Sequence, residues 1–258
     1  MRLALAWTDY SLRTIKAQSK KVSDMHHLIV VAHPAEDSFT MGLTRSYAAE
    51  LEKLGHSQRT CDLYRMGFDP VLTAQELVPV SSDHPARADV VKAQDDIRAA
   101  DVLTVIYPLW WMSMPAMMKG YIDRSFARGF AYESHNGVVR GLLSGKKAVL
   151  ITISGAPLPL LVKSGNWNAV QVLQDTHVFR SAGFELLEHL HFDEVVPQLP
   201  KTVAEQHMAR VRLLRRAAFP SGLEQFGRPR RRSCRSLLRI KKENDSWQKA
   251  KLMPPYGL

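Results

Sequence analysis

The chain has 258 residues, an apolar content of 45% and a formal net charge of +10. This length is enough for one or two domains with a substantial core. No apolar run in the sequence approaches the 18 residues that a membrane-spanning helix needs, so we expect no membrane span. The two cysteines, Cys61 and Cys234, show neither disulfide nor metal spacing, which favours a reducing compartment and a cytoplasmic protein.

The positive charge is concentrated at the two ends of the chain. Residues 25–200 contain 15 Lys and Arg against 19 Asp and Glu, whereas residues 1–24 contain 5 against 2 and residues 201–258 contain 15 against 4. The body of the fold is therefore mildly acidic, and a basic nucleic-acid-binding face is not expected there. Nucleic-acid binding through residues 228–242 is an alternative that the lack of interleaved aromatic residues disfavours.

Three regions are expected along the chain. Residues 1–24 are predicted to be a loosely ordered N-terminal extension, whose apolar run is too short for a signal peptide. Residues 25–218 are predicted to form the folded domain. Residues 219–258 form a basic tail with little apolar periodicity, which is expected to be disordered unless a partner orders it.

Short apolar runs alternate with segments of helical spacing through the body of the chain. The predicted strands are 27–32, 57–63, 102–107, 147–154 and 185–191, of which the polar 57–63 is expected at an edge. The predicted helices are 41–55, 83–100, one after Pro115, 167–181 and 202–217, with a further short helix after Thr73 and a loop at 129–146. This alternation predicts an α/β fold: a doubly wound, five-stranded parallel sheet of flavodoxin-like order 2-1-3-4-5, in three α/β/α layers.

In a sheet of this order, three loops meet at the carboxyl edge, where ligands of open α/β proteins bind. Loop 33–40 leads into a helix, whose first N–H groups suit a phosphate together with the hydroxyls of Ser38 and Thr40. Loop 108–112 holds two tryptophans that can wall a flat heterocycle. After the fourth strand, Gly155 permits close approach of the backbone to a ligand.

Simpler structural roles are open for the same residues. Ser38 and Thr40 can be helix caps alone, and His33 at a strand end is more often structural than catalytic. One of the two tryptophans can belong to the core, because the methionines around it have the character of packing residues. Arg124, on the predicted helix after Pro115, is expected at a solvated position.

Motifs for several other kinds of chemistry are missing from the sequence. No His, Cys or Asp cluster has metal-ligand spacing, so no metal site is expected. No GxGxxG follows the first strand, and neither a P-loop nor a GxSxG motif occurs. A Rossmann dinucleotide site and a nucleophilic serine are therefore not expected.

Two segments carry a resemblance to a known family. They are AHPAEDSFT, at residues 32–40, and YPLWWMSMPAMMKGYIDRSF, at 107–126, which GFAY follows at 129–132. With the weaker segment GKKAVLITISGAP, at 145–157, they resemble the NAD(P)H:quinone oxidoreductase (DT-diaphorase) family, which includes modulator-of-drug-activity proteins. This is a family of flavodoxin-like flavoproteins.

The resemblance implies FAD as the cofactor, with FMN as the alternative, and NAD(P)H as the co-substrate. The flavin pyrophosphate and ribityl contacts would fall on the first loop and the isoalloxazine contacts on the other two. The implied cofactor-binding residues are His33, Ser38, Phe39, Thr40, Pro108, Leu109, Trp110, Trp111, Met112, Ile153, Ser154 and Gly155. The implied catalytic positions are Gly155 and Tyr132, and Tyr132 would line the nicotinamide and quinone pocket across the interface of a homodimer.

The chain departs from this family after the fourth strand. Ile153–Ala156 stands where the quinone reductases carry Thr-Thr-Gly-Gly. A tyrosine and a histidine that offset charge on the reduced flavin of the animal enzymes have no clear equivalents between Leu158 and Asn168. Backbone N–H groups are the expected substitutes.

The implied reaction is a ping-pong, two-electron transfer from NAD(P)H through the flavin to a quinone or similar acceptor. One alternative is a flavin-binding regulatory subunit of a potassium-efflux transporter, and another is a flavodoxin-type electron carrier. The carrier is disfavoured because docking to protein partners favours a strongly charged rim over an aromatic pocket.

Overall fold

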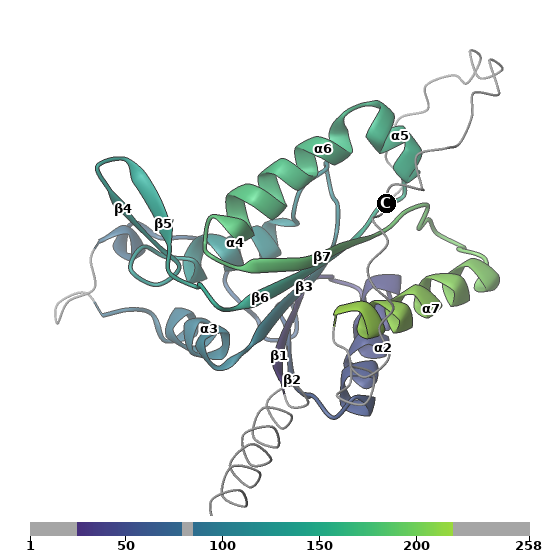
Figure 1. The fold of residues 1–258 in the computed structure, drawn as a ribbon, viewed down its shortest axis with the longest axis horizontal. Coiled ribbons are helices and arrows are strands. Elements are labelled where there is room, and N and C mark those ends of the chain that lie inside the picture. The colour runs from purple at the N-terminus through teal and green to yellow at the C-terminus, as the bar shows by residue number, and fades with distance from the viewer. Residues whose placement is uncertain (1–24, 79–84, 219–258) are drawn as a thin grey trace, which may run out of the picture.

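The computed structural model describes residues 25–78 and 85–218, with residues 212–218 as backbone only. The extension predicted for 1–24 and the tail predicted for 219–258 lie outside the described residues. The described chain forms a five-stranded parallel sheet in the order β2-β1-β3-β6-β7 (Figure 1). Its strands are β1 (His26–Val31), β2 (Ser57–Asp62), β3 (Val102–Pro108), β6 (Lys147–Ile153) and β7 (Glu185–Phe192). Counted among these five, the order is 2-1-3-4-5, so the predicted fold class is confirmed.

The position of each strand explains its composition. Every residue of β3, at the centre of the sheet, is buried, which is why its sequence is a continuous apolar run rather than an alternating one. β2 lies at an edge and exposes Ser57, Arg59 and Thr60, as its polar sequence predicts.

Helices cover both faces of the sheet and make the three predicted layers (Figure 1). One face packs on α2 (Phe39–Lys53) and α7 (Lys201–Ala218), around Leu43, Tyr47 and Val211. The other face packs on α3 (Ala88–Ala99), α4 (Ala116–Ser125), α6 (Asn166–Val170) and the π-helix η2 (Gln171–Arg180), whose buried residues join one core cluster.

A β-hairpin occupies the segment 129–146, where a loop was predicted. β4 (Tyr132–His135) pairs antiparallel with β5 (Val138–Gly141). Asn136 and Gly137 connect them with φ values of 51° and 78°, the conformation of a type I′ turn, for which Asn-Gly is the favoured pair. The Asn-Gly signal was present in the sequence, but the flanking strands are too short and polar to predict.

The segment before β7 is more helical than predicted. A helix over 167–181 was expected, whereas α5 (Leu158–Lys163) already begins just after β6, and α6 and η2 follow it. In η2 the hydrogen bonds span five residues, as from Ser181 N–H to Thr176 O at 2.9 Å. Such π-helical turns are rare and concentrate at functional sites.

Arg124 is buried, which corrects the prediction of a solvated position. Its side chain is 0% exposed and contacts Glu76 and Asp89, each at 2.7 Å. Glu76 lies in η1 (Ala74–Leu77), the short helix predicted after Thr73. Its Oε2 also accepts from Thr73 N–H at 2.9 Å. A buried cation needs such partners. Arg124 therefore links the segment between β2 and α3, which contains Glu76, to α3 and α4.

Candidate active site

The three predicted loops lie together at the carboxyl edge of the sheet. β1, β3 and β6 are adjacent and parallel, so the residues that follow them leave the sheet side by side. Leu109 N–H donates to Ile153 O at 2.7 Å, and the rings of His33 and Trp110 are 6.0 Å apart. The structure thus brings the loop after β3 into contact with both of the others.

The loop after β3 is a tight turn that holds two exposed tryptophans. Trp110 and Ser113 exchange backbone hydrogen bonds of 3.1 and 3.0 Å. Between them, Trp111 and Met112 have φ values of 54° and 58°, a left-handed conformation that is costly for residues other than glycine. Trp110 is 42% exposed and Trp111 is 79% exposed. Strained backbone and exposed indoles at one turn make this surface a candidate for ligand contact.

The neighbouring residues of this loop are less accessible. Pro108 and Leu109 are buried, and Met112 is half-buried against the core. At the end of β6, Ile153 is buried, whereas Gly155 is exposed. These residues can therefore offer mainly backbone groups and one wall of the site, while Trp110 and Trp111 offer ring surface.

The start of α2 shows the helix cap, one of the two roles that the sequence left open. Ser38 Oγ accepts from Met41 N–H at 3.3 Å, so the Ser38 hydroxyl is a helix cap. The Thr40 side chain is buried, and the Phe39 ring packs on Phe192 and His207 at 6.2 and 5.8 Å. Phe39 and Thr40 can therefore reach a ligand only through their backbone N–H groups, which point out of the first turn of the helix.

Arg65 supports the loop after β1, a role that the sequence did not predict. Its guanidinium donates to His33 O at 3.0 Å and to Pro34 O at 2.8 Å. The His33 ring accepts from Ala35 N–H at 3.1 Å. His33 is thus half-buried and held by its own loop, which agrees with its structural role and leaves its ring near Trp110.

Five buried side chains lie behind the loop after β6, and we call them the histidine chain. They are Asp175, His189, Thr152, His191 and Ser154, joined in this order by hydrogen bonds of 2.7, 2.9, 2.9 and 3.0 Å. Of these, sequence reasoning found only Ser154. The histidines occupy alternate positions of β7, so both side chains point to one face. This spacing was visible, but the partners on β6 and η2 depend on tertiary contacts.

The imidazole of His191, which lies next to Ser154 in the histidine chain, is neutral. Burial, with a smaller contribution from nearby His189, lowers the pKa of His191 to about 4. Close by, Tyr107 donates to Gln174, and burial together with the Asp175 carboxylate raises the pKa of Tyr107 well above its ordinary value. At neutral pH, His191 and Tyr107 are therefore both uncharged.

Tyr132 is not brought to the other predicted residues within one chain. Tyr132 begins the β4–β5 hairpin and pairs with Gly141 at the end of β5. Two residues later, Leu143 N–H donates to Ala182 O at 2.9 Å. Ala182 lies just before β7 begins at Glu185, so the hairpin sits towards the amino edge of the sheet. A role for Tyr132 at the carboxyl edge therefore requires a second copy of the chain.

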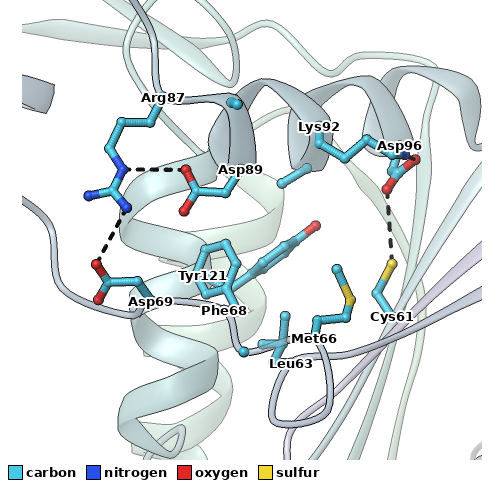
Figure 2. A pocket seen from close by; sticks show the side chains of 13 residues that line it. Cys61, Leu63, Met66, Phe68, Asp69, Arg87, Asp89, Lys92, Asp96 and Tyr121 are labelled. Atoms are coloured by element: carbon cyan, nitrogen blue, oxygen red, sulfur yellow. Dashed lines mark hydrogen bonds and ion pairs between the residues drawn. The ribbon is translucent and has the colours of Figure 1, made fainter.

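A cavity of about 450 Å³ lies elsewhere, between the end of β2, α3 and α4 (Figure 2). None of its lining residues belongs to the predicted site. Its charged side chains are paired among the described residues: Arg87 with Asp69 and Asp89 at 3.5 and 3.4 Å, and Lys92 with Asp96. Burial raises the pKa of Cys61 in its wall, which keeps that thiol protonated. The cavity offers neither an unpaired charge nor an activated nucleophile.

Within 25–78 and 85–218, no group of three or more His, Cys, Asp and Glu side chains could hold a metal ion. In the same part of the chain, every helix is too short or too polar to cross a bilayer.

Comparisons with known proteins identify the family of the fold. A family model described as a flavodoxin-like fold matches residues 25–214. An uncharacterized NAD(P)H oxidoreductase of Haemophilus influenzae is 31% identical over 175 residues, which cover 66% of this chain and 85% of that protein. Ribosyldihydronicotinamide dehydrogenase (quinone) of Mus musculus is 32% identical over 154 residues, which cover 54% of this chain and 67% of that protein.

A solved structure gives the same result. The NAD(P)H:quinone oxidoreductase from Methanothermobacter marburgensis is similar with a TM-score of 0.67 and 27% identity, over 74% of this chain and 96% of that one. The resemblance predicted from the loop segments is confirmed by these matches.

Proposed function

Since this chain belongs to the family with the flavodoxin-like fold, and its relatives include NAD(P)H oxidoreductases, we propose that it is a flavin-dependent oxidoreductase. It takes a hydride from NAD(P)H and reduces a quinone or a similar acceptor. The observation that carries this proposal is the Trp110–Ser113 turn, where exposed indoles stand on strained backbone between two other loops of the sheet edge.

The residues present at the edge fit a flavin. Trp110 and Trp111 offer ring surface for the isoalloxazine, since flat aromatic groups stack well on indoles. The backbone N–H groups of Phe39 and Thr40, at the positive end of α2, would hold phosphate. Gly155 lets the backbone after β6 approach the ring system, because it has no side chain in the way.

When bound, the flavin would supply the redox chemistry, accepting a hydride from NAD(P)H and passing two electrons to an acceptor. The chain itself needs no nucleophile. Its loops would bind and orient the ring system, and Trp111 would shield it from water. A single stacking surface that serves the nicotinamide and then the acceptor gives ping-pong kinetics.

We propose FAD as the flavin, with FMN as the alternative, and a cytoplasmic homodimer as the working form. The dimer is supported by the position of Tyr132, which lies towards the amino edge of its own sheet and reaches an active site only in a partner. In that arrangement, Tyr132 would contact the nicotinamide or the acceptor.

Steady-state kinetics of the flavin-loaded protein with NADPH and a benzoquinone test the proposal. We expect turnover, with parallel lines in double-reciprocal plots at several quinone concentrations. Negligible turnover with quinones and nitro-aromatic acceptors by a protein that retains flavin would contradict the enzyme proposal and favour a flavin-binding subunit. Heat release of the flavin followed by chromatography distinguishes FAD from FMN.

Sedimentation velocity and one variant test the dimer. We expect a dimer at micromolar concentration, and Tyr132→Ala should raise the KM for the quinone about tenfold with the flavin retained. A monomeric protein with full activity would contradict the role of Tyr132.

A further inference from the structure

The histidine chain connects the buried interior to the candidate site without a break. It runs from Asp175 through His189, Thr152 and His191 to Ser154 in bonds of 2.7 to 3.0 Å. The His189 side chain is only 3% exposed, and His191 as a whole is also 3% exposed. Hydrogen bonds between such buried groups are strong and fix their partners.

The fold itself sets this alignment. In the register of β6 and β7, Thr152 lies opposite His191, and Ser154 follows two residues after Thr152 on the same face. The Trp167 ring covers both imidazoles, with centroid distances of 4.9 and 4.7 Å to His189 and His191. A chain of this kind is shielded from solvent, so its protons can move only along its own hydrogen bonds.

Counting protons shows that the chain has two states. Thr152 Oγ1 lies between His189 Nε2 and His191 Nδ1, but a hydroxyl has one proton to donate. When that proton goes to His189, His191 must carry its own proton on Nδ1, and its bare Nε2 then accepts from Ser154. When the proton goes to His191, His189 must carry protons on both nitrogens, and His191 donates from Nε2 to Ser154.

The second state holds one more proton than the first. In both states His189 Nδ1 donates to the Asp175 carboxylate at 2.7 Å. In this state the Ser154 hydroxyl points away from His191, as in its 2.9 Å bond to Ala156 O. Protonation deep in the core is thus coupled to the direction of a hydroxyl at the edge of the sheet.

We propose that the histidine chain is a proton relay between the His189–Asp175 pair and Ser154, and that it delivers one proton to the bound flavin when a hydride adds negative charge there. The recipient rests on the proposed function, since Ser154 is an expected flavin contact. His189 and His191 act through Ser154 and are therefore positioning residues.

The proton transfers along the relay balance. Ser154 gives up its proton outward and takes the Nε2 proton of His191. His191 takes the Thr152 proton on Nδ1, and Thr152 takes the Nε2 proton of His189. His189 ends neutral, with its Nδ1–H still on the Asp175 carboxylate, and every bond of the chain between His189 and Ser154 is reversed. One proton has moved, and no other reactant is needed.

The charged groups around His191 and His189 are consistent with a proton relay. His191 faces His189, Asp193 and Arg210, and Arg210 also donates to His191 O at 3.1 Å. Burial lowers the pKa of His191 to about 4, so it passes a proton without keeping a charge. Asp175 contacts His189 directly at 2.7 Å, so the inner end of the relay is a carboxyl group on an imidazole.

Nuclear magnetic resonance of the full chain with ¹⁵N-labelled histidine tests the relay without flavin. In wild type, we expect the His191 proton to move from Nδ1 to Nε2 at the same pH midpoint at which His189 gains its second proton. Thr152→Val removes the bridging hydroxyl and should separate the two midpoints by about one pH unit, a tenfold change in proton affinity. Thr152→Ser restores the hydroxyl and should keep them together, which controls for misfolding of the valine variant.

The reduced holoprotein gives the second measurement. Its absorbance spectrum should titrate with a midpoint that Thr152→Val and Ser154→Ala shift by about one pH unit and Thr152→Ser leaves in place. The relay is overturned if His191 keeps one tautomer while His189 titrates, or if Thr152→Val leaves the two midpoints together. If the enzyme turns over although His189 and His191 change protonation independently, only the relay is contradicted. If the two histidines are coupled but the protein binds no flavin, the proposed function is contradicted, and with it the flavin as the recipient of the proton.

Discussion

The cavity beside α3 and the turn after β3 are opposite kinds of surface. The cavity has a volume of about 450 Å³, but its charges are paired with one another. The turn instead combines two positive φ angles with an indole that is 79% exposed. Proteins keep strained and exposed features of this kind where function needs them. The difference teaches that the candidate site stands out by backbone strain and ring exposure, whereas the cavity stands out by its volume.

Arg124, beside the cavity, should give the largest effect on stability. Arg124→Leu removes the buried cation that holds Glu76 and Asp89, although Asp89 keeps Arg87, and the lost charge-assisted hydrogen bonds cost about 3 kcal/mol of unfolding free energy. The control is Lys119→Ala on the same helix, an exposed residue paired with Asp123, expected to cost less than about 1 kcal/mol. Urea denaturation measures both, and equal effects would show that Arg124 is not a structural cation.

The histidine chain behind the turn should make stability depend on pH. Because the folded-state pKa of His191 is about 4, below its ordinary 6.5, the unfolded chain binds more protons between these values. The unfolding free energy should therefore fall by about 2 kcal/mol as the pH drops from 6.5 to 4. His27, whose pKa burial lowers to about 3, acts in the same direction. His191→Gln should remove part of this slope in denaturation curves measured across that range, and an unchanged slope would contradict its buried, neutral state.

Substitutions at two tryptophans distinguish the effect of backbone strain on stability from the effect of side-chain packing. Trp111→Gly removes an exposed ring and relieves a positive φ, so the unfolding free energy should change by less than about 1 kcal/mol. Trp167→Gly removes a ring packed on His189 and His191 and should cost about 2 kcal/mol or more. Chemical denaturation compares them. A large loss in Trp111→Gly would mean that the turn is held by packing rather than kept for a ligand.

Lys92 in the cavity should give the smallest effect. Its ammonium is exposed and pairs with Asp96 within one helix, an arrangement worth less than about 1 kcal/mol. Lys92→Ala should therefore leave stability and turnover close to wild type. A large loss of turnover would make the cavity part of the active site and would reverse the comparison.

The sequence predicted the sheet and the site edge because both depend on local patterns. The continuous apolar run of β3 is typical of a strand buried on two faces, and helices that alternate with strands predict a parallel sheet. Once the strand order is known, the loops after β1, β3 and β6 must share an edge. Ser38 at the start of a helix likewise predicted the cap that the structure shows.

Contacts between distant segments could not be predicted in this way. Arg124 has the spacing of a solvated helix residue, and its burial depends on Glu76 and Asp89, which lie 48 and 35 residues away. The alternation of His189 and His191 was visible, but their function depends on the register with Thr152 and on the π-helix that supplies Asp175. The positive φ at Trp111 left no signal in the sequence, because indoles are rare in left-handed turns.

Equilibrium titration of the apoprotein with FAD tests the central claim most directly. Trp111→Gly should weaken FAD binding tenfold or more, because it removes a stacking surface, while Lys92→Ala in the cavity should bind FAD as wild type does. Unchanged affinity in Trp111→Gly together with weakened binding in Lys92→Ala would contradict the account and move the flavin from the edge of the sheet to the cavity.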